Sequence, residues 1–89
     1  MIRLRLFSSL REIAGTREVE VEGEELSISQ ALTKFAERFE KAKDMLFDKD
    51  GKLFPSVLLL VNGESTDDGP GTRVKSGDVV SVLLPTAGG

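Results

Sequence analysis

The residues whose type and position could support chemistry stand at the end of the sequence, where Gly88 and Gly89 follow LPTA. The reactive group would be the carboxylate of Gly89. A carboxylate that reacts in the buried active site of another protein must pass through a narrow channel. Glycine fits there because it lacks Cβ and adopts backbone angles that other residues cannot. The pair therefore predicts acyl chemistry at Gly89, with Gly88 as the slim residue behind it. The alternative is that the two glycines end the sequence by chance, which is expected in about 0.5% of chains.

The composition argues against catalysis by the chain itself. Its 89 residues include no cysteine and no histidine, so thiol catalysis, disulfides and iron–sulfur clusters are excluded, and the usual general base is missing. The net charge of −3 disfavours binding to nucleic acid or to an anionic membrane. The longest apolar run, residues 57–61, is far too short to span a bilayer. We expect a cytoplasmic protein that is not an enzyme and holds no cofactor of its own.

One acidic turn, residues 48–51 with the sequence DKDG, has part of the spacing of a calcium-binding loop. The similarity stops there, because Leu46 occupies the position of the first ligand and Val57 that of the last. Neither side chain offers an oxygen atom to a cation. We therefore expect no metal site.

Alternating apolar residues at the start of the chain predict a hairpin. The segment MIRLRLF alternates over residues 1–7, and residues 16–22 alternate in the same way, which predicts two antiparallel strands. Between them, SLRE at residues 9–12 has the form of a capping box, and Gly15 stands at a suitable helix end. This stretch predicts a short helix over residues 8–14.

The main helix is expected to begin at Ser27, where SISQ has the form of a second capping box. Behind it, six apolar residues recur at helical spacing and would face the core: Ile28, Ala31, Leu32, Phe35, Ala36 and Phe39. The segment that follows the helix is less regular, and its apolar residues are expected to cover the end of the core: Met45, Leu46, Phe47 and Phe54. The run at residues 57–61, closed by the turn Asn62-Gly63, and the alternation of residues 79–84 predict further strands.

One helix packed on a sheet, with a hairpin before it and strands after it, predicts an α+β architecture. If the first and last strands lie parallel at the centre of a mixed sheet, both are buried. That arrangement is the β-grasp, or ubiquitin-like, fold. We expect residues 1–84 to form this single domain and residues 85–89 to form a flexible tail that ends in Gly-Gly.

The sheet face that turns away from the main helix is a candidate docking surface. Alternation assigns Phe7, Leu59 and Leu83 to this face, where they would form an exposed apolar group, and such groups usually mark a partner site. Three basic residues are candidates to frame it and to pair with acidic groups of a partner: Arg3, Arg5 and Arg73. The alternatives are that residues 47–54 fold over the apolar group and that the arginines form an ordinary solvated face.

Taken together, several segments resemble the ubiquitin-like sulfur carriers and modifiers, which include the small subunit of molybdopterin synthase and the archaeal small ubiquitin-like modifiers. The segments are LFSSLREIAGTREVEV, SISQAL, VNGE and VKSGDVVSVLLPTAGG. The stretch FDKDGKLF before VLLLVNGE is similar to the archaeal branch. The likeness covers nearly the whole chain, with one departure: Leu84 stands where the family often has a second proline before its tail.

The resemblance implies that an E1-like enzyme uses ATP to adenylate the carboxylate of Gly89. In a sulfur carrier the adenylate becomes a thiocarboxylate that serves molybdenum cofactor synthesis, and the large subunit of molybdopterin synthase is then a partner. In a protein modifier Gly89 forms an isopeptide bond with a lysine of a target protein. The resemblance leaves both roles open, and one protein can perform both.

A third hypothesis needs no chemistry at the terminus. The chain would then be a non-covalent ubiquitin-like docking module with an idle tail, which binds through the apolar face alone. Five lysines could themselves receive a modifier, and nothing in the sequence selects one of them: Lys34, Lys41, Lys49, Lys52 and Lys75.

Overall fold

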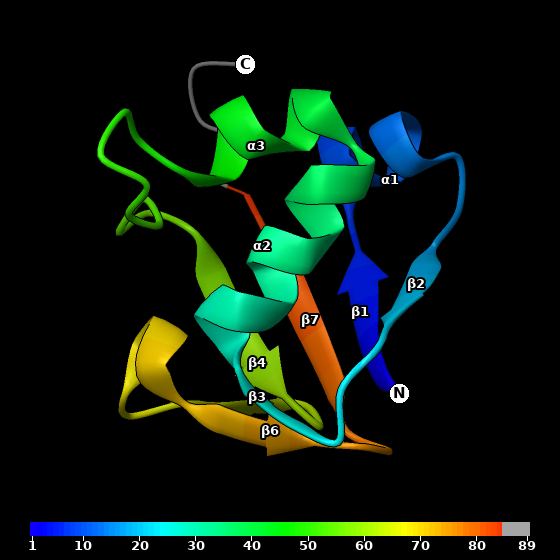
Figure 1. The fold of residues 1–89 in the computed structure, drawn as a ribbon, viewed down its shortest axis with the longest axis vertical. Coiled ribbons are helices and arrows are strands. Elements are labelled where there is room, and N and C mark those ends of the chain that lie inside the picture. The colour runs from blue at the N-terminus through cyan, green and yellow to red at the C-terminus, as the bar shows by residue number, and fades with distance from the viewer. Residues whose placement is uncertain (85–89) are drawn as a thin grey trace.

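The computed structural model describes residues 1–84, and its first and last strands lie side by side in the middle of a five-stranded sheet (Figure 1). β1 (Ile2–Leu6) runs parallel to β7 (Val79–Leu83). β2 (Glu18–Val21) pairs antiparallel with the other edge of β1, while β4 (Leu58–Val61) and then β5 (Glu64–Ser65) extend the sheet beyond β7. The strand order β2-β1-β7-β4-β5 confirms the expected β-grasp fold.

The main helix, α2 (Ile28–Arg38), begins at the predicted capping box. The backbone N–H of Gln30 donates to Ser27 Oγ at 3.1 Å, and the Ser27 N–H donates to Gln30 Oε1 at 2.9 Å. These two bonds satisfy backbone donors that a helix start otherwise leaves unpaired. The buried face of α2 consists of five of the six predicted residues: Ile28, Ala31, Leu32, Phe35 and Ala36.

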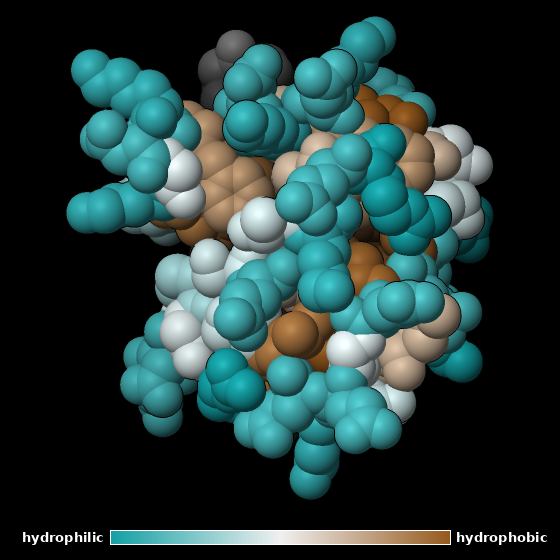
Figure 2. All heavy atoms as spheres, in the orientation of Figure 1, coloured by the Kyte–Doolittle hydropathy of each residue, from teal (hydrophilic) through white to brown (hydrophobic). Residues whose placement is uncertain are grey.

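The core lies between α2 and one face of the sheet. From the sheet it takes the inward-facing side chains of β1, β2 and β7: Ile2, Leu4, Leu6, Val19, Val21, Val80 and Val82. All seven are at most 5% exposed, so the predicted alternation of these strands is confirmed. The opposite face of α2 is polar, and Figure 2 shows mainly hydrophilic side chains on the helix side of the molecule.

The short helix α1 (Ser8–Ala14) has the predicted bounds and ends at Gly15, whose φ of 73° is the left-handed conformation that glycine favours. The predicted capping box at residues 9–12 is wrong. The N-cap is Phe7, and no side chain caps this helix. The chain turns sharply at Ser8, which has a φ of 50°, so the helix begins directly after the extended Phe7 and not at Ser9.

Residues 40–56 contain a helix where the sequence predicted none, α3 (Glu40–Leu46). Its seven residues bury only Ala42 and Leu46, which is too little to produce a recognisable period. The turn at residues 48–51 is confirmed. There the carboxylate of Asp48 accepts the backbone N–H groups of Asp50 at 2.8 Å and Lys52 at 3.0 Å.

A second, two-stranded sheet was also not predicted. It pairs β3 (Glu25–Ser27) with β6 (Arg73–Lys75), just after the short 3-10 turn η1 (Gly69–Gly71). Each strand has three residues and turns a single large apolar side chain toward the core. Three residues are too few for alternation to be read from the sequence.

Candidate functional site

The candidate reactive residues Gly88 and Gly89, and the flexible tail predicted for residues 85–89, lie outside the described residues. The structure does show where the chain arrives before the tail. β7 ends at Leu83, and Leu84 packs against the edge of the core. Because β1 and β7 are parallel and Leu6 pairs with Val82, both strands end at the same edge of the sheet. Phe7 and α1 therefore stand next to the point from which the tail departs.

The sheet face opposite α2 carries a run of apolar side chains across β4 and β7. The register pairs Leu58 with Leu83 and Leu60 with Ser81, so all four side chains share this outer face. Leu58 is 62% exposed, while Leu60 and Leu83 are half-buried. Phe7, also half-buried, continues the alternation of β1 in an extended conformation and points to the same face. We call Phe7, Leu58, Leu60 and Leu83 the outer patch.

The prediction that Leu59 belongs to this face is wrong. Leu59 pairs with Val82, which is completely buried, and packs against the core. The physical reason is the register, which the turn at Asn62 and Gly63 sets. Both turn residues have positive φ, and the Asn62 N–H donates to Val79 O at 2.8 Å. Leu58 and Leu60, on either side of Leu59, point to the outer face.

The predicted alternative, in which residues 47–54 cover the apolar face, is not what the structure shows. Phe47 and Leu53 form an isolated bridge, and the Phe54 N–H donates to Leu46 O at 2.8 Å, which ties the segment to the end of α3. Phe47 is buried in the core and Phe54 packs against it. Within residues 1–84, this segment therefore does not cover the outer patch.

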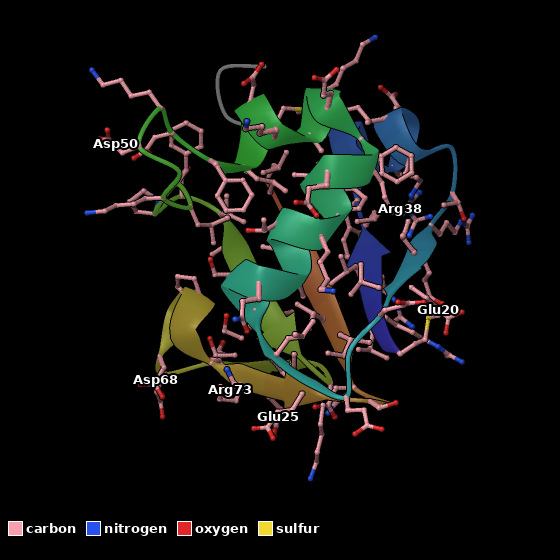
Figure 3. All side chains as sticks on the ribbon, viewed as in Figure 1. Glu20, Glu25, Arg38, Asp50, Asp68 and Arg73 are labelled. Carbon is pink, nitrogen blue, oxygen red and sulfur yellow. The ribbon has the colours of Figure 1, made fainter. Side chains whose placement is uncertain are left out.

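The arginines around the patch have different partners. Arg5 forms an ion pair with Glu18 across β1 and β2, at 2.9 Å, and Arg3 stands opposite Glu20 in the same ladder. The prediction that Arg73 frames the patch is wrong, because Arg73 lies in the small sheet and pairs with Glu25 at 3.4 Å (Figure 3).

Sequence reasoning missed a further arginine beside the patch. The guanidinium carbon of Arg11 lies 5.8 Å from the centre of the Phe7 ring, which is within the range of a cation–π interaction. The spacing of the two residues, four apart at the start of a helix, is the one signal that could have indicated the contact.

A hydrogen-bonded carboxylate fixes the entry of β7. Asp78 accepts the backbone N–H of Lys75 at 2.8 Å and the side-chain amide of Asn62 at 3.1 Å. These two bonds, the backbone bond first, hold the pKa of Asp78 below its ordinary value of 3.8. Asn62 Oδ1 also accepts the Val79 N–H at 3.0 Å. The network locks two turns together and so sets the register that exposes Leu58.

Among residues 1–84, no group of three or more acidic, histidine or cysteine side chains is arranged to hold a metal ion. Within the same range, no helix is both long and apolar enough to cross a membrane.

The sequence matches the ThiS family over residues 4–89. It is 30% identical to a candidate sulfur carrier protein of Archaeoglobus fulgidus, over 99% of this chain and 98% of that one. It is also 30% identical to small archaeal modifier protein 1 of Haloferax volcanii, over 96% of this chain and 97% of the relative.

Solved structures show the same fold. The solution structure of small archaeal modifier protein 1 from Methanosarcina acetivorans has a TM-score of 0.84 and 29% identity, covering 99% of this chain and 95% of that one. Subunit 1 of a candidate molybdopterin converting factor from Pyrococcus furiosus has a TM-score of 0.73 and 29% identity, covering 94% of this chain and 95% of that one. A chain in the BexX/CysO complex of Amycolatopsis orientalis has a TM-score of 0.80 and 25% identity, with full coverage of both chains.

Proposed function

Since this chain belongs to the ThiS family of ubiquitin-like sulfur carriers and modifiers, which are not enzymes, we propose that it acts through the carboxylate of Gly89. The observation that carries the proposal is that the family match extends through Gly89. The strand before the tail also ends beside the outer patch, which supports it. The chain contains no histidine or cysteine, so another protein supplies the catalytic groups.

The proposed chemistry begins with adenylation of Gly89 by an E1-like enzyme. A carboxylate oxygen of Gly89 attacks the α-phosphate of ATP, and pyrophosphate leaves. The resulting acyl adenylate is then attacked at its carbonyl carbon, and AMP leaves. With sulfide as the nucleophile the product is a thiocarboxylate. With a lysine amine it is an isopeptide bond. ATP is a substrate of the activating enzyme, and this chain needs no cofactor of its own.

The names of the matched relatives favour both outcomes, because one is described as a sulfur carrier and another as a modifier. As a carrier, the chain would deliver sulfur to the large subunit of molybdopterin synthase, and the similarity to a converting-factor subunit supports this role. As a modifier, its partners are lysines of target proteins. We place it in the cytoplasm, where ATP is available for activation.

The outer patch is the proposed docking surface for these enzymes. It combines the exposed Leu58 with three half-buried apolar side chains and with arginines at its edge. Protein interfaces typically place such an apolar centre inside a polar rim.

The experiment is an intact-mass measurement of the full chain after incubation with its E1-like enzyme, ATP and sulfide. The wild type is expected to gain the mass of one oxygen-to-sulfur exchange, and a Gly89 deletion is expected to gain nothing. An unchanged wild type, with an enzyme that activates a second carrier in parallel, would rule out sulfur carriage.

The modifier role has its own readout. The sequence contains no lysine or arginine after Lys75, so trypsin would leave the whole of residues 76–89 on a modified lysine. A search of cellular lysines for this branch tests conjugation directly. If the search finds none and deletion of Gly88 and Gly89 leaves the cellular function intact, the chain is a docking module with an idle tail.

A further inference from the structure

We propose that Arg11, held over the ring of Phe7, recognises a carboxylate on the adenylating enzyme that takes up Gly89. The inference rests on the proposed function, because it specifies the chemistry of the partner at that site. It assigns the electrostatic part of docking to one residue, which the outer patch alone does not do.

The position of the Arg11 guanidinium is set by its neighbours. Its carbon lies 5.8 Å from the centre of the Phe7 ring, and the ring attracts a cation to its face. Phe7 is held outward in turn, because it extends β1 while Ser8, with a φ of 50°, turns the chain abruptly into α1. A left-handed conformation is costly for a residue with a side chain, and such corners often occur at functional positions.

Within residues 1–84, Arg11 differs from the other arginines in having a buried nitrogen without a hydrogen bond, and three of the others have a polar partner. Arg5 pairs with Glu18, Arg73 pairs with Glu25, and Arg38 donates to the backbone oxygen of Glu20 at 2.8 Å. Within residues 1–84, Arg11 has no ion pair and no side-chain hydrogen bond. Its Nε is buried and unpaired, whereas its two terminal nitrogens remain accessible.

This state of Arg11 favours an acidic partner. A guanidinium stays charged at any physiological pH, and burying one of its nitrogens without a hydrogen bond is unfavourable. A carboxylate that approaches the terminal nitrogens compensates the charge with two parallel, charge-assisted hydrogen bonds. Since the Phe7 ring of the outer patch lies beside Arg11, the partner's aspartate or glutamate should adjoin an apolar side chain.

The location of Arg11 connects it to activation. Five residues separate Leu84 from the end of the sequence, and a chain of five residues reaches at most about 18 Å. An enzyme that reacts with Gly89 must therefore cover part of the surface around Leu84. Phe7 lies on that surface, because it follows β1 directly and β1 and β7 end at the same edge of the sheet. Arg11 lies against the Phe7 ring.

The test is steady-state ATP–pyrophosphate exchange by the adenylating enzyme of the source organism, with the full chain as substrate. We expect Arg11→Gln to raise the KM for the carrier about tenfold or more, because a charge-assisted hydrogen bond is lost. The kcat should be unchanged, because Arg11 touches no reacting atom. The KM of this variant should also depend less on salt concentration than that of the wild type.

Two further variants make the result specific. Arg73→Gln removes the same charge from an arginine already paired with Glu25, and it should behave like the wild type. Arg11→Lys keeps the charge without the planar fork and should recover only part of the loss. Because lysine retains a long apolar stem, this variant also keeps the packing of α1 if Arg11→Gln unfolds.

The possible failures are distinguishable. If the wild type supports exchange and both Arg11 variants match Arg73→Gln in KM, Arg11 does not recognise the enzyme and the inference is overturned. If the wild type supports no exchange with an enzyme that is active on another carrier, the proposed function fails first and the inference fails with it.

Discussion

Truncating Leu59 to alanine should destabilise the fold, whereas the same change at Leu58, one residue earlier, should leave stability nearly intact and weaken docking. The two residues are chemically identical neighbours on β4, and the register places them on opposite faces of the sheet. Leu59 stands beside the completely buried Val82, and Leu58 stands beside the half-buried Leu83.

The magnitudes follow from burial. A leucine-to-alanine change in a core costs about 2–5 kcal/mol, and the half-buried Leu59 belongs near the lower end, at about 2 kcal/mol. Complete burial of a leucine side chain contributes about 1.5–3 kcal/mol. Leu58 is 62% exposed and realises well under half of that. Its truncation should therefore cost less than about 1 kcal/mol.

Urea unfolding followed by circular dichroism measures both effects. The midpoint of Leu59→Ala should fall clearly, with an unchanged m-value, while that of Leu58→Ala should stay close to the wild type. In the exchange assay, Leu58→Ala should raise the KM for the carrier and Leu59→Ala should not. Equal loss of stability in the two variants, or a larger loss at Leu58, would refute the register and with it the outer patch.

Three other predictions concern stability. Phe35→Ala should cost about 3–5 kcal/mol in urea unfolding, because Phe35 is completely buried and its ring lies 5.1 Å from that of Phe39. Gly23→Ala should lower the melting temperature, because its φ is 151° and a Cβ would stand 2.7 Å from a methyl group of Leu26; an unchanged value would contradict this geometry. The lowered pKa of Asp78 adds stability above pH 3.8, and this stability is lost as the pH falls through the folded pKa. The free energy of unfolding should therefore fall less with acidification in Asp78→Asn than in the wild type.

The parts of the fold that the sequence predicted are those with long or unambiguous patterns. Ser27 and Gln30 marked the start of α2, and five of the six apolar residues at helical spacing form its buried face. Strict alternation identified β1, and the apolar run interrupted by Ser81 identified β7. The missing elements are short: α3 buries two residues and the strands of the small sheet have three residues each. Their conformations depend on tertiary packing that no local period records.

The candidate site was predictable only where alternation was visible. Phe7 and Leu83 were assigned correctly, because Phe7 follows Arg3 and Arg5 at a spacing of two residues and Leu83 follows Ser81 at the same spacing. The run VLLLV contains no such alternation, so the face of Leu59 depended on a register that Asn62 and Asp78 set through hydrogen bonds. Arg11 was missed because its significance depends on a buried, unpaired Nε and on its contact with the Phe7 ring, which only coordinates reveal.

The most direct test of the central claim is tandem mass spectrometry of the tryptic peptide 76–89, after incubation of the full chain with its E1-like enzyme, ATP and sulfide. Cleavage after Lys75 isolates β7 together with the tail, and fragment ions locate a modification to a single residue. We predict that sulfur replaces one oxygen of the Gly89 carboxylate and that every fragment lacking Gly89 keeps its ordinary mass. Sulfur at another residue, or an unmodified peptide from an enzyme that is active on a second carrier, would contradict activation at Gly89.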